Sequence, residues 1–439
     1  MSINNIKSYG FSLIVIVAMT FSSCKGFFGN VNVDPNAAND SPPSALLITA
    51  ETRLTYTIGG DFTRFGSIFT QHIDGSDRQF ASFQTYTFVP GDFGTAWDNL
   101  YSNTLADLKQ LKIKADASSL NAYSGIARAL EAHTLMMIAD YFGDAPYSDA
   151  LDAERTFQPK YDSQAKLYEA IFTLLTDARA KLALAPGGIK PSVDDIIYGG
   201  NNAKWTKYCN VLAARAYLHL AKLDAGNYAK ALAELTKGGF ASGADDARFA
   251  FSGGTVGDAP WFQYIGQRGD VKVGANYVSL LTDLADPRKA KYGADIDDVH
   301  PIFTATQKVP LLTFTEQKFI EAECKLSSNA ADAKTAMLDG IKASFADAGA
   351  DATKYAAYVA QAKVAPATVT LKEIITQKYI ALFTDPEVFN DWRRTGIPAL
   401  KPNIGSTIPR RFLYPQGELD LNSNTPKGTK LTDRVAWDK

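Results

Sequence analysis

Two stretches of the sequence share one pattern, in which a helix, a tight turn and a second helix follow one another. Residues 210–235 (NVLAARAYLHLAKLDAGNYAKALAEL) turn at Gly226 and Asn227, and residues 319–341 (FIEAECKLSSNAADAKTAMLDGI) turn at 327–329. The alanines expected where the first two helices meet are Ala213, Ala214, Ala216, Ala229, Ala231 and Ala233. Helix pairs of this kind stack into tetratricopeptide-type solenoids. The pattern therefore predicts an all-α fold, an α/α superhelix of tetratricopeptide-like helix pairs.

Helical periodicity covers most of the chain and is interrupted by three long insertions. No fixed repeat of about 34 residues connects the helix pairs, because the segments between them vary in length. The periodicity predicts helices near 44–58, 61–72, 92–114, 118–141, 163–184, 203–223, 228–237, 313–326, 330–345, 352–363 and 371–383. Residues 71–91, 238–273 and 401–439 lack it. We expect ligand contacts in such insertions, because loops on a rigid scaffold usually carry recognition residues.

The N-terminal residues have the features of an exported lipoprotein. Lys7 precedes an apolar run at 11–19 (FSLIVIVAM), which is too short to span a bilayer but fits a signal-peptide core. Small residues then lead into Cys24 at the position of a bacterial lipobox, so we predict cleavage before Cys24 and its acylation. The predicted organisation is a signal peptide at 1–23, a lipidated tether at 24–43 and one folded domain at 44–439.

The motif content favours a binding protein over an enzyme. A net charge of −2 with interspersed charges gives no basic face for nucleic acid. The histidines are scattered outside metal-binding spacings, and no nucleophile or phosphate-binding motif occurs. We therefore predict no catalytic residue, metal or cofactor. The residues expected to be buried inside helices are His133, His219 and the free thiols Cys209 and Cys324.

Binding chemistry is better represented than catalytic chemistry. Sugars and other amphipathic nutrients require aromatic planes edged by amide, carboxylate or guanidinium groups. The predicted ligand-binding residues are His72, Asp77, Arg78, Gln79, Phe83, Tyr86, Trp97, Tyr101, Trp261, Tyr264 and Arg268. Core packing is the alternative for the rings, and a surface ion pair is the alternative for Asp77 and Arg78. The residues expected to pair with carboxylates such as Glu387 and Asp391 are Arg393, Arg394, Arg410 and Arg411.

A series of strings along the mature chain resembles the SusD/RagB-like family of Bacteroidetes lipoproteins, and most closely its second SusD-like branch. The strings are VDPNAA, QHIDGSDRQF, FGTAWDNLYS, DYFGDAPYSDAL, FQPKYDSQ, DDIIYGGNNAKWTKYCNVLAARAYLHLAK, EIITQKYIALFTDPEVFNDWRRTGIPAL and IPRRFLYPQGELDLN. Their shared order, behind a lipobox, makes the resemblance specific. It implies four tetratricopeptide-like helix pairs, an outer-membrane location facing the cell surface, and a SusC-like TonB-dependent barrel as partner. One departure is that residues 25–29 lack the acidic residues common after the acylated cysteine of surface-exported members.

The resemblance implies capture of an oligomeric nutrient, by default a glycan, and its delivery to the transporter. Two other functions remain open. A protein-interaction scaffold would have no ligand site of its own, and its 71–101 loop would collapse onto the core. A surface hydrolase would need two facing carboxylates about 5–9 Å apart, or a metal. With 47 acidic residues, the sequence selects no such pair.

Overall fold

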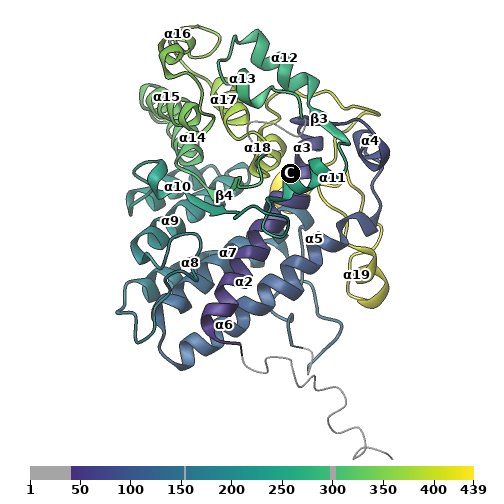
Figure 1. Ribbon diagram of the computed structural model, residues 1–439, viewed down its shortest axis with the longest axis vertical. Coiled ribbons are helices and arrows are strands. Elements are labelled where there is room, and N and C mark those ends of the chain that lie inside the picture. The colour runs from purple at the N-terminus through teal and green to yellow at the C-terminus, as the bar shows by residue number, and fades with distance from the viewer. Residues whose placement is uncertain (1–40, 153–154, 297–302) are drawn as a thin grey trace, which may run out of the picture. The chain divides into compact units, whose positions relative to one another are not determined.

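Stacked helix pairs form the body of the protein, as the periodicity predicts. The computed structural model describes residues 41–152, 155–296 and 303–439. The pairs are α7 (Asn121–Phe142) with α8 (Gln164–Leu182), α9 (Asn202–His219) with α10 (Gly226–Thr236), and α14 (Phe314–Lys325) with α15 (Ala330–Asp347). A further pair joins α2 (Pro43–Thr57) to α6 (Ala106–Ala117). Figure 1 shows α8, α9, α10, α14 and α15 following one another along one side. The predicted all-α superhelix is confirmed.

Polar caps and small residues explain where these helices begin and how closely they pack. The Asn329 side chain, at the predicted turn, accepts hydrogen bonds from the backbone N–H groups of Ala331 and Asp332 and so starts α15. A side chain at Gly340 would come within 2.9 Å of the Phe319 ring, so glycine lets α14 and α15 approach. In α10 only part of the expected alanine face is buried.

The correction for α10 concerns its two outer alanines. Ala231 is fully buried, whereas Ala229 and Ala233, which are four residues apart and share the opposite face, are exposed. The contact face of α10 therefore uses Leu235 and Ala231 rather than a continuous row of alanines.

Helix α7 lies at the centre of the body. Nearly all of its residues are buried, including polar ones such as Thr134 and Asp140, so it has no solvent face. A helix that is covered all round belongs to the core of a large domain. His133 and His219 are buried and hydrogen-bonded, and Cys209 and Cys324 are buried free thiols, all as predicted.

Several predicted helices are shorter or divided. The segment near 61–72 becomes the π-helical turn η2 (Ile58–Phe62) and α3 (Thr63–Phe69). The segment near 92–114 becomes α5 (Gly94–Asp98), the π-helical η4 (Asn99–Leu105) and α6. The end of the chain adds α16 (Tyr355–Val359), α17 (Leu371–Ala381), α18 (Glu387–Thr395) and α19 (Gln416–Leu421). Helix α18 was not among the predicted helices; four of its residues are charged, yet all of its residues except Thr395 are buried.

The insertions contain regular structure that periodicity did not indicate. Residues 71–91 form β1 (Ile73–Gly75) and α4 (Arg78–Gln84), so the expectation of a wholly irregular loop is wrong. The second insertion and its continuation form β2 (Ala247–Ala250), α11 (Pro260–Gln267), β3 (Val271–Val273), α12 (Ala275–Asp283), α13 (Lys289–Tyr292) and β4 (Lys308–Leu312). Strand β1 pairs antiparallel with β3, and β2 pairs antiparallel with β4.

The N-terminal predictions fall outside this description. Cys24, the signal peptide and nearly all of the tether precede residue 41, and His300 lies in the gap at 297–302. No helix within the described ranges is long and apolar enough to cross a membrane.

Candidate functional site

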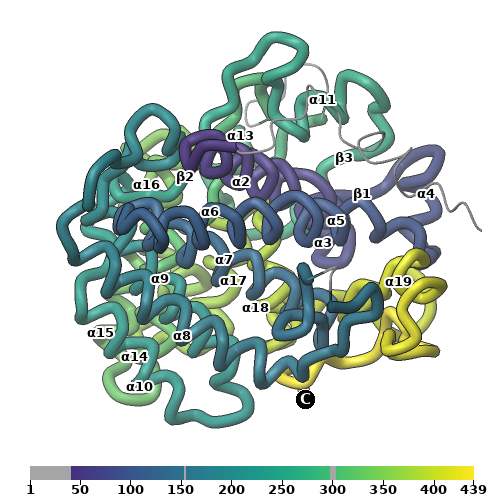
Figure 2. Tube along the Cα trace, turned by 90° about the horizontal axis from the view of Figure 1, so that it is seen from below, coloured from purple at the N-terminus to yellow at the C-terminus, as the bar shows by residue number. Residues whose placement is uncertain are grey.

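The two predicted recognition segments are neighbours in space. Ile73 of β1 pairs with Val273 of β3, and the Ser76 N–H donates to the Asp270 carbonyl over 2.8 Å. The Phe80 and Tyr264 rings lie 5.0 Å apart, which joins α4 to α11. Figure 2 shows β1, β3, α4 and α11 in the same region. Sequence analysis named these segments separately and could not place them together.

Five of the predicted rings lie in the core and are not exposed. His72 is fully enclosed, accepts a hydrogen bond from the Thr384 N–H, and lies 3.0 Å from the Tyr379 carbonyl. The other four buried side chains are Phe83, Trp97, Tyr101 and Trp261. For these five residues the structure shows the alternative of core packing, because neighbouring rings cover them. The Phe83 ring stacks on Phe88 with centres 4.2 Å apart, and the Trp97 ring lies tilted against Tyr101 with centres 4.5 Å apart.

The remaining predicted residues form a polar surface over these rings. Arg78 lies 2.7 Å from the buried carboxylate of Asp270. The Asp77 carboxylate is farther away, at 4.0 Å, so the main partner of Arg78 is Asp270. Gln79 donates to Asp92 over 3.2 Å, and the Tyr86 hydroxyl accepts from the Asn403 N–H over 3.1 Å. The exposed members of this surface are Asp77, Arg78, Gln79 and Arg268, and Tyr86 and Tyr264 are half-buried.

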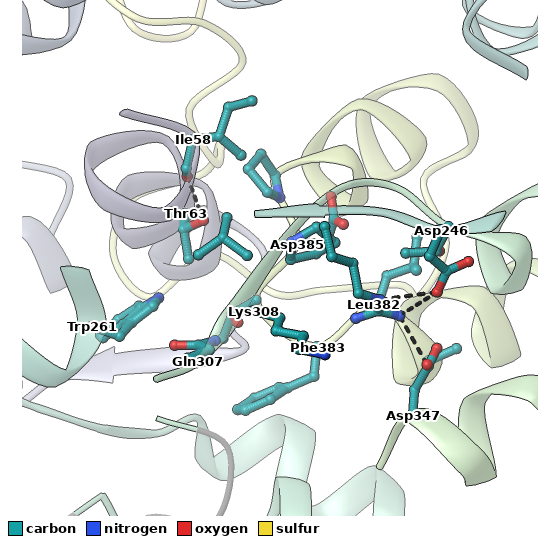
Figure 3. A pocket seen from close by; sticks show the side chains of 18 of the residues that line it. Ile58, Thr63, Asp246, Trp261, Gln307, Lys308, Asp347, Leu382, Phe383 and Asp385 are labelled. Atoms are coloured by element: carbon teal, nitrogen blue, oxygen red, sulfur yellow. Dashed lines mark hydrogen bonds and ion pairs between the residues drawn. The ribbon is translucent and has the colours of Figure 1, made fainter. Parts of the chain in front are cut away.

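A pocket of about 550 Å³ is lined in part by Trp261 of α11. Its lining comes from η2 and α3, the start of β2, α11, β4 with the residues before it, the end of α15, and the link between α17 and α18. Trp261 is the one predicted site residue in this lining. Figure 3 shows Trp261 and Gln307 at one end of the pocket, Asp246 and Asp347 at the other, and Asp385 between them. A pocket of this size holds one or two sugar units or a comparable ligand.

Aromatic rings form an apolar wall of the pocket. Trp261 stacks on Phe303 with ring centres 4.8 Å apart, and Tyr292 lies 5.3 Å from Phe383. Phe303 and Phe383 are in turn 5.9 Å apart, so these rings form a continuous row. Three of them, Trp261, Tyr292 and Phe383, line the pocket directly.

Two polar atoms in the pocket lining have no hydrogen-bond partner among the residues that the structure describes. These are Nε1 of Trp261, whose residue is only 2% exposed, and Oε1 of Gln307. A buried donor or acceptor left without a partner costs about 1–3 kcal/mol. A ligand that supplies one acceptor and one donor recovers this energy. Threonine hydroxyls at 63, 304, 306, 313 and 384 add further polar groups to the lining.

The opposite end of the pocket is ion-paired. Arg248 lies 2.8 Å from both Asp246 and Asp347 (Figure 3). Asp385 accepts a hydrogen bond from the Glu387 N–H over 2.9 Å. Burial raises the pKa of Asp385 to about 7; Glu316 adds to this rise, and Arg215 opposes it.

A buried charge network lies behind Asp385 and connects the helix pairs. Arg215 on α9 pairs with Glu316 on α14, and His219 lies 2.7 Å from Glu387 on α18. Burial alone would lower the pKa of His219, but the carboxylates of Glu387 and Asp140 outweigh it and raise the pKa to about 9. The charged imidazolium in turn helps hold the pKa of Glu387 well below its ordinary value. Ion pairs of this kind fix neighbouring helices relative to one another.

The predicted arginine–carboxylate pairs are confirmed for two residues and wrong for two. Arg394 pairs with Glu323 and Asp391, and Arg410 pairs with Asp438. Arg393 instead donates to the Asp140 carbonyl, and Arg411 donates to the Phe142 carbonyl. Both carbonyls belong to the last turn of α7, where no further turn of helix supplies donors.

Comparisons with known proteins agree with this fold. The sequence model of a SusD-like family, described as "starch-binding associating with outer membrane", matches residues 35–301 and 297–415. A SusD/RagB family protein from Bacteroides thetaiotaomicron is 22% identical, with a TM-score of 0.78 over 91% of this chain and 99% of that one. A chitin-binding SusD homologue from Flavobacterium johnsoniae is 22% identical, with a TM-score of 0.76 over 90% and 97% of the two chains. No curated protein sequence matches significantly. Because the family model covers most of its length, the chain belongs to the SusD-like family of outer-membrane-associated proteins, in the second branch that its motifs indicate.

Proposed function

We propose that this protein is an outer-membrane lipoprotein that captures an oligomeric nutrient, a glycan, and passes it to a SusC-like TonB-dependent transporter. In this proposal the acylated Cys24 anchors it, with the folded body facing the cell surface. The observation that carries the proposal is the pocket in which Trp261 and Gln307 present unpartnered polar atoms beside an aromatic wall.

The pocket has the two kinds of surface that a sugar requires. A sugar ring has an apolar face and an edge of hydroxyl groups, each of which both donates and accepts a hydrogen bond. The row of rings that includes Trp261 and Tyr292 suits the apolar face. The Trp261 N–H and Gln307 Oε1 suit the hydroxyl edge, since one needs an acceptor and the other a donor.

The exposed polar surface is proposed to contact the parts of the glycan that extend beyond the pocket. Helix α11 belongs to both regions, because Trp261 lines the pocket while Tyr264 packs against Phe80 of α4. Asp77, Gln79 and Arg268 are exposed members of this surface that could reach a ligand. Two structural neighbours are described as chitin-binding proteins, which supports a glycan as the ligand class.

We propose binding without hydrolysis. Asp246 and Asp347 are both held by Arg248, so neither is free to act as an acid or base against the other. Within the described residues, no group of three or more His, Cys, Asp or Glu side chains could hold a metal ion. A scaffold without a ligand site agrees with the buried rings of residues 72–101 but leaves the pocket and its unpartnered atoms without a role.

Calorimetry with a panel of neutral oligosaccharides and oligopeptides tests the capture step. Trp261→Phe removes the unpartnered N–H but keeps a ring, and should weaken binding of a glycan about 10-fold. Trp97→Phe makes the same change at a buried site outside the pocket and should leave binding unchanged. Equal effects of the two variants, or binding of peptides alone, would contradict the proposal. Incubation with each oligosaccharide should release no new reducing ends.

A second experiment addresses the anchor and the partner. Metabolic labelling with a fatty-acid analogue should mark the wild-type protein and not Cys24→Ala. The labelled protein should co-purify with a SusC-like TonB-dependent barrel, in the presence of the glycan found by calorimetry. Labelling that persists in Cys24→Ala would remove the proposed anchor.

A further inference from the structure

The pocket contains more acidic than basic groups. Its carboxylates are Asp246, Asp347 and Asp385, and its cations are Arg248 and Lys308. Arg248 is divided between Asp246 and Asp347, at 2.8 Å from each, so it balances only one of the two charges. An anionic ligand therefore meets no unshared cation at this end of the pocket.

The second cation of the pocket, Lys308, does not offset the excess of negative charge. It lies at the exposed start of β4 and forms no ion pair with the described residues. Solvent and salt weaken the field of an exposed ammonium group within about 8–10 Å. Asp385 is more enclosed, and the field of a charge is stronger where water is excluded. The electrostatic potential inside the pocket is therefore negative, because the carboxylates outweigh Lys308.

Asp385 is placed to act on a ligand directly. Figure 3 shows it between the Trp261 end and the ion-paired end. One of its oxygens accepts the Glu387 N–H, which fixes the carboxyl group at the start of α18. The groups that surround it from behind are Glu316 of α14, Glu387 of α18 and Arg215 of α9.

We infer that the pocket admits uncharged sugar residues and excludes those that carry carboxylate, sulfate or phosphate groups, with Asp385 as the residue that determines this specificity. The inference rests on the proposed function, because it names the class of glycan that the same pocket takes. Neutral sugars satisfy Asp385 in either protonation state, since a hydroxyl group can donate to the carboxylate or accept from the carboxylic acid. A charged sugar would be repelled by the ionised form.

The pH dependence follows from the same geometry. Because the pKa of Asp385 is raised to about 7, it is largely ionised at about pH 8.5 and largely protonated at about pH 5.5. Exclusion of anionic sugars should therefore be stronger at the higher pH. Affinity for neutral sugars should change little, since both forms of Asp385 bind a hydroxyl group.

The test compares each neutral oligosaccharide that binds with the same oligosaccharide carrying one terminal residue oxidised to a uronate. Calorimetry is performed at both pH values on wild type, Asp385→Asn and Asp420→Asn. Asparagine keeps the acceptor for the Glu387 N–H, and Asp420 is an exposed aspartate on α19 that does not line the pocket. Melting temperatures establish that each variant is folded.

The expected result is that the uronate form binds wild type at least about 10-fold more weakly than the neutral form at the higher pH. Asp385→Asn should reduce this ratio several-fold, and Asp420→Asn should not change it. A uronate form that binds wild type as tightly as the neutral form would overturn the inference while leaving glycan capture intact. The inference would also be overturned, with glycan capture intact, if neither pH nor Asp385→Asn changed the ratio of neutral to uronate affinity. If no neutral oligosaccharide binds, the proposed function itself fails, and the inference with it.

Discussion

Ile73 and Val273 are directly paired in a short antiparallel ladder, although about 200 residues separate them. The ladder joins the two insertions that sequence analysis selected for recognition, and it is supported by the contact between Arg78 and Asp270. Asp270 is fully buried, whereas the Arg78 side chain is 58% exposed. The polar surface of α4 and the pocket wall formed by α11 are therefore positioned by the same contacts.

Replacing Arg78 with alanine should loosen this junction. The substitution leaves the buried carboxylate of Asp270 without its cation, and the expected cost is about 1–2 kcal/mol, because Arg78 is already half in solvent. Urea unfolding measures the change. Lys354→Ala removes an exposed pair with Asp351, 4.0 Å away, and should cost less than about 0.5 kcal/mol. Equal costs for the two variants would show that Asp270 needs no partner.

A second prediction concerns the close contact between η2 and β4. A β-carbon at Gly59 would lie 2.9 Å from a methyl group of Val309, so Gly59→Ala forces Val309, which also lines the pocket, to shift. The expected loss of stability is about 1–3 kcal/mol, with weaker ligand binding. Gly94→Ala on α5 meets no neighbouring atom within 4 Å and should be neutral or stabilising by up to about 1 kcal/mol. Calorimetry and thermal unfolding of both variants test the contrast.

The helix pairs could be predicted from sequence because their determinants are local. Apolar periodicity and a turn residue such as Asn329, which caps α15, are readable without tertiary information. The π-helical turn η2 was missed because the backbone of Gly60 within it departs from helical angles, which periodicity does not indicate. Strand β1, with three residues, was too short to show an alternating pattern.

The candidate site was harder to predict, because burial is decided by distant parts of the chain. Phe83 and Trp261 are the residue types expected on a sugar platform, yet both are enclosed by rings that sequence analysis could not place beside them. The pocket draws on segments from Ile58 to Pro386, and only the segment at 381–386 falls in one of the family strings.

Burial also separates the two kinds of ion pair in the molecule. Arg394 and Glu323 are each 2% exposed, so Arg394→Met leaves an unpaired carboxylate in the core and should cost about 3–5 kcal/mol. Lys230 pairs with Asp224 at 3.7 Å with both side chains mostly in solvent, and Lys230→Met should cost less than about 0.5 kcal/mol. The double variant Arg394→Met, Glu323→Leu should recover part of the first loss. If the double variant recovers no stability in chemical unfolding, the loss in Arg394→Met comes from Asp391, the other carboxylate that pairs with Arg394.

Two of the enclosed histidines, His219 and His72, should give opposite pH dependences of stability. The pKa of His219 is raised to about 9 in the folded protein, above its ordinary value of 6.5, so the folded state holds a proton that the unfolded state releases. Its stabilisation is complete below about pH 6.5 and is lost as the pH rises through about 9. The pKa of His72 is lowered to about 3 by burial, so its contribution is complete above about pH 6.5 and is lost as the pH falls.

Urea midpoints measured across this pH range on His219→Gln and His72→Gln separate the two effects. In His219→Gln the urea midpoint should fall less steeply at alkaline pH, and its dependence on acid pH should match that of wild type. His72→Gln should flatten the acid side alone, because its neutral ring only accepts the Thr384 N–H and contacts the Tyr379 carbonyl. An alkaline decline that persists in His219→Gln would show that His219 is neutral when folded. Glu387 and Asp140 would then face each other without the cation that the network requires.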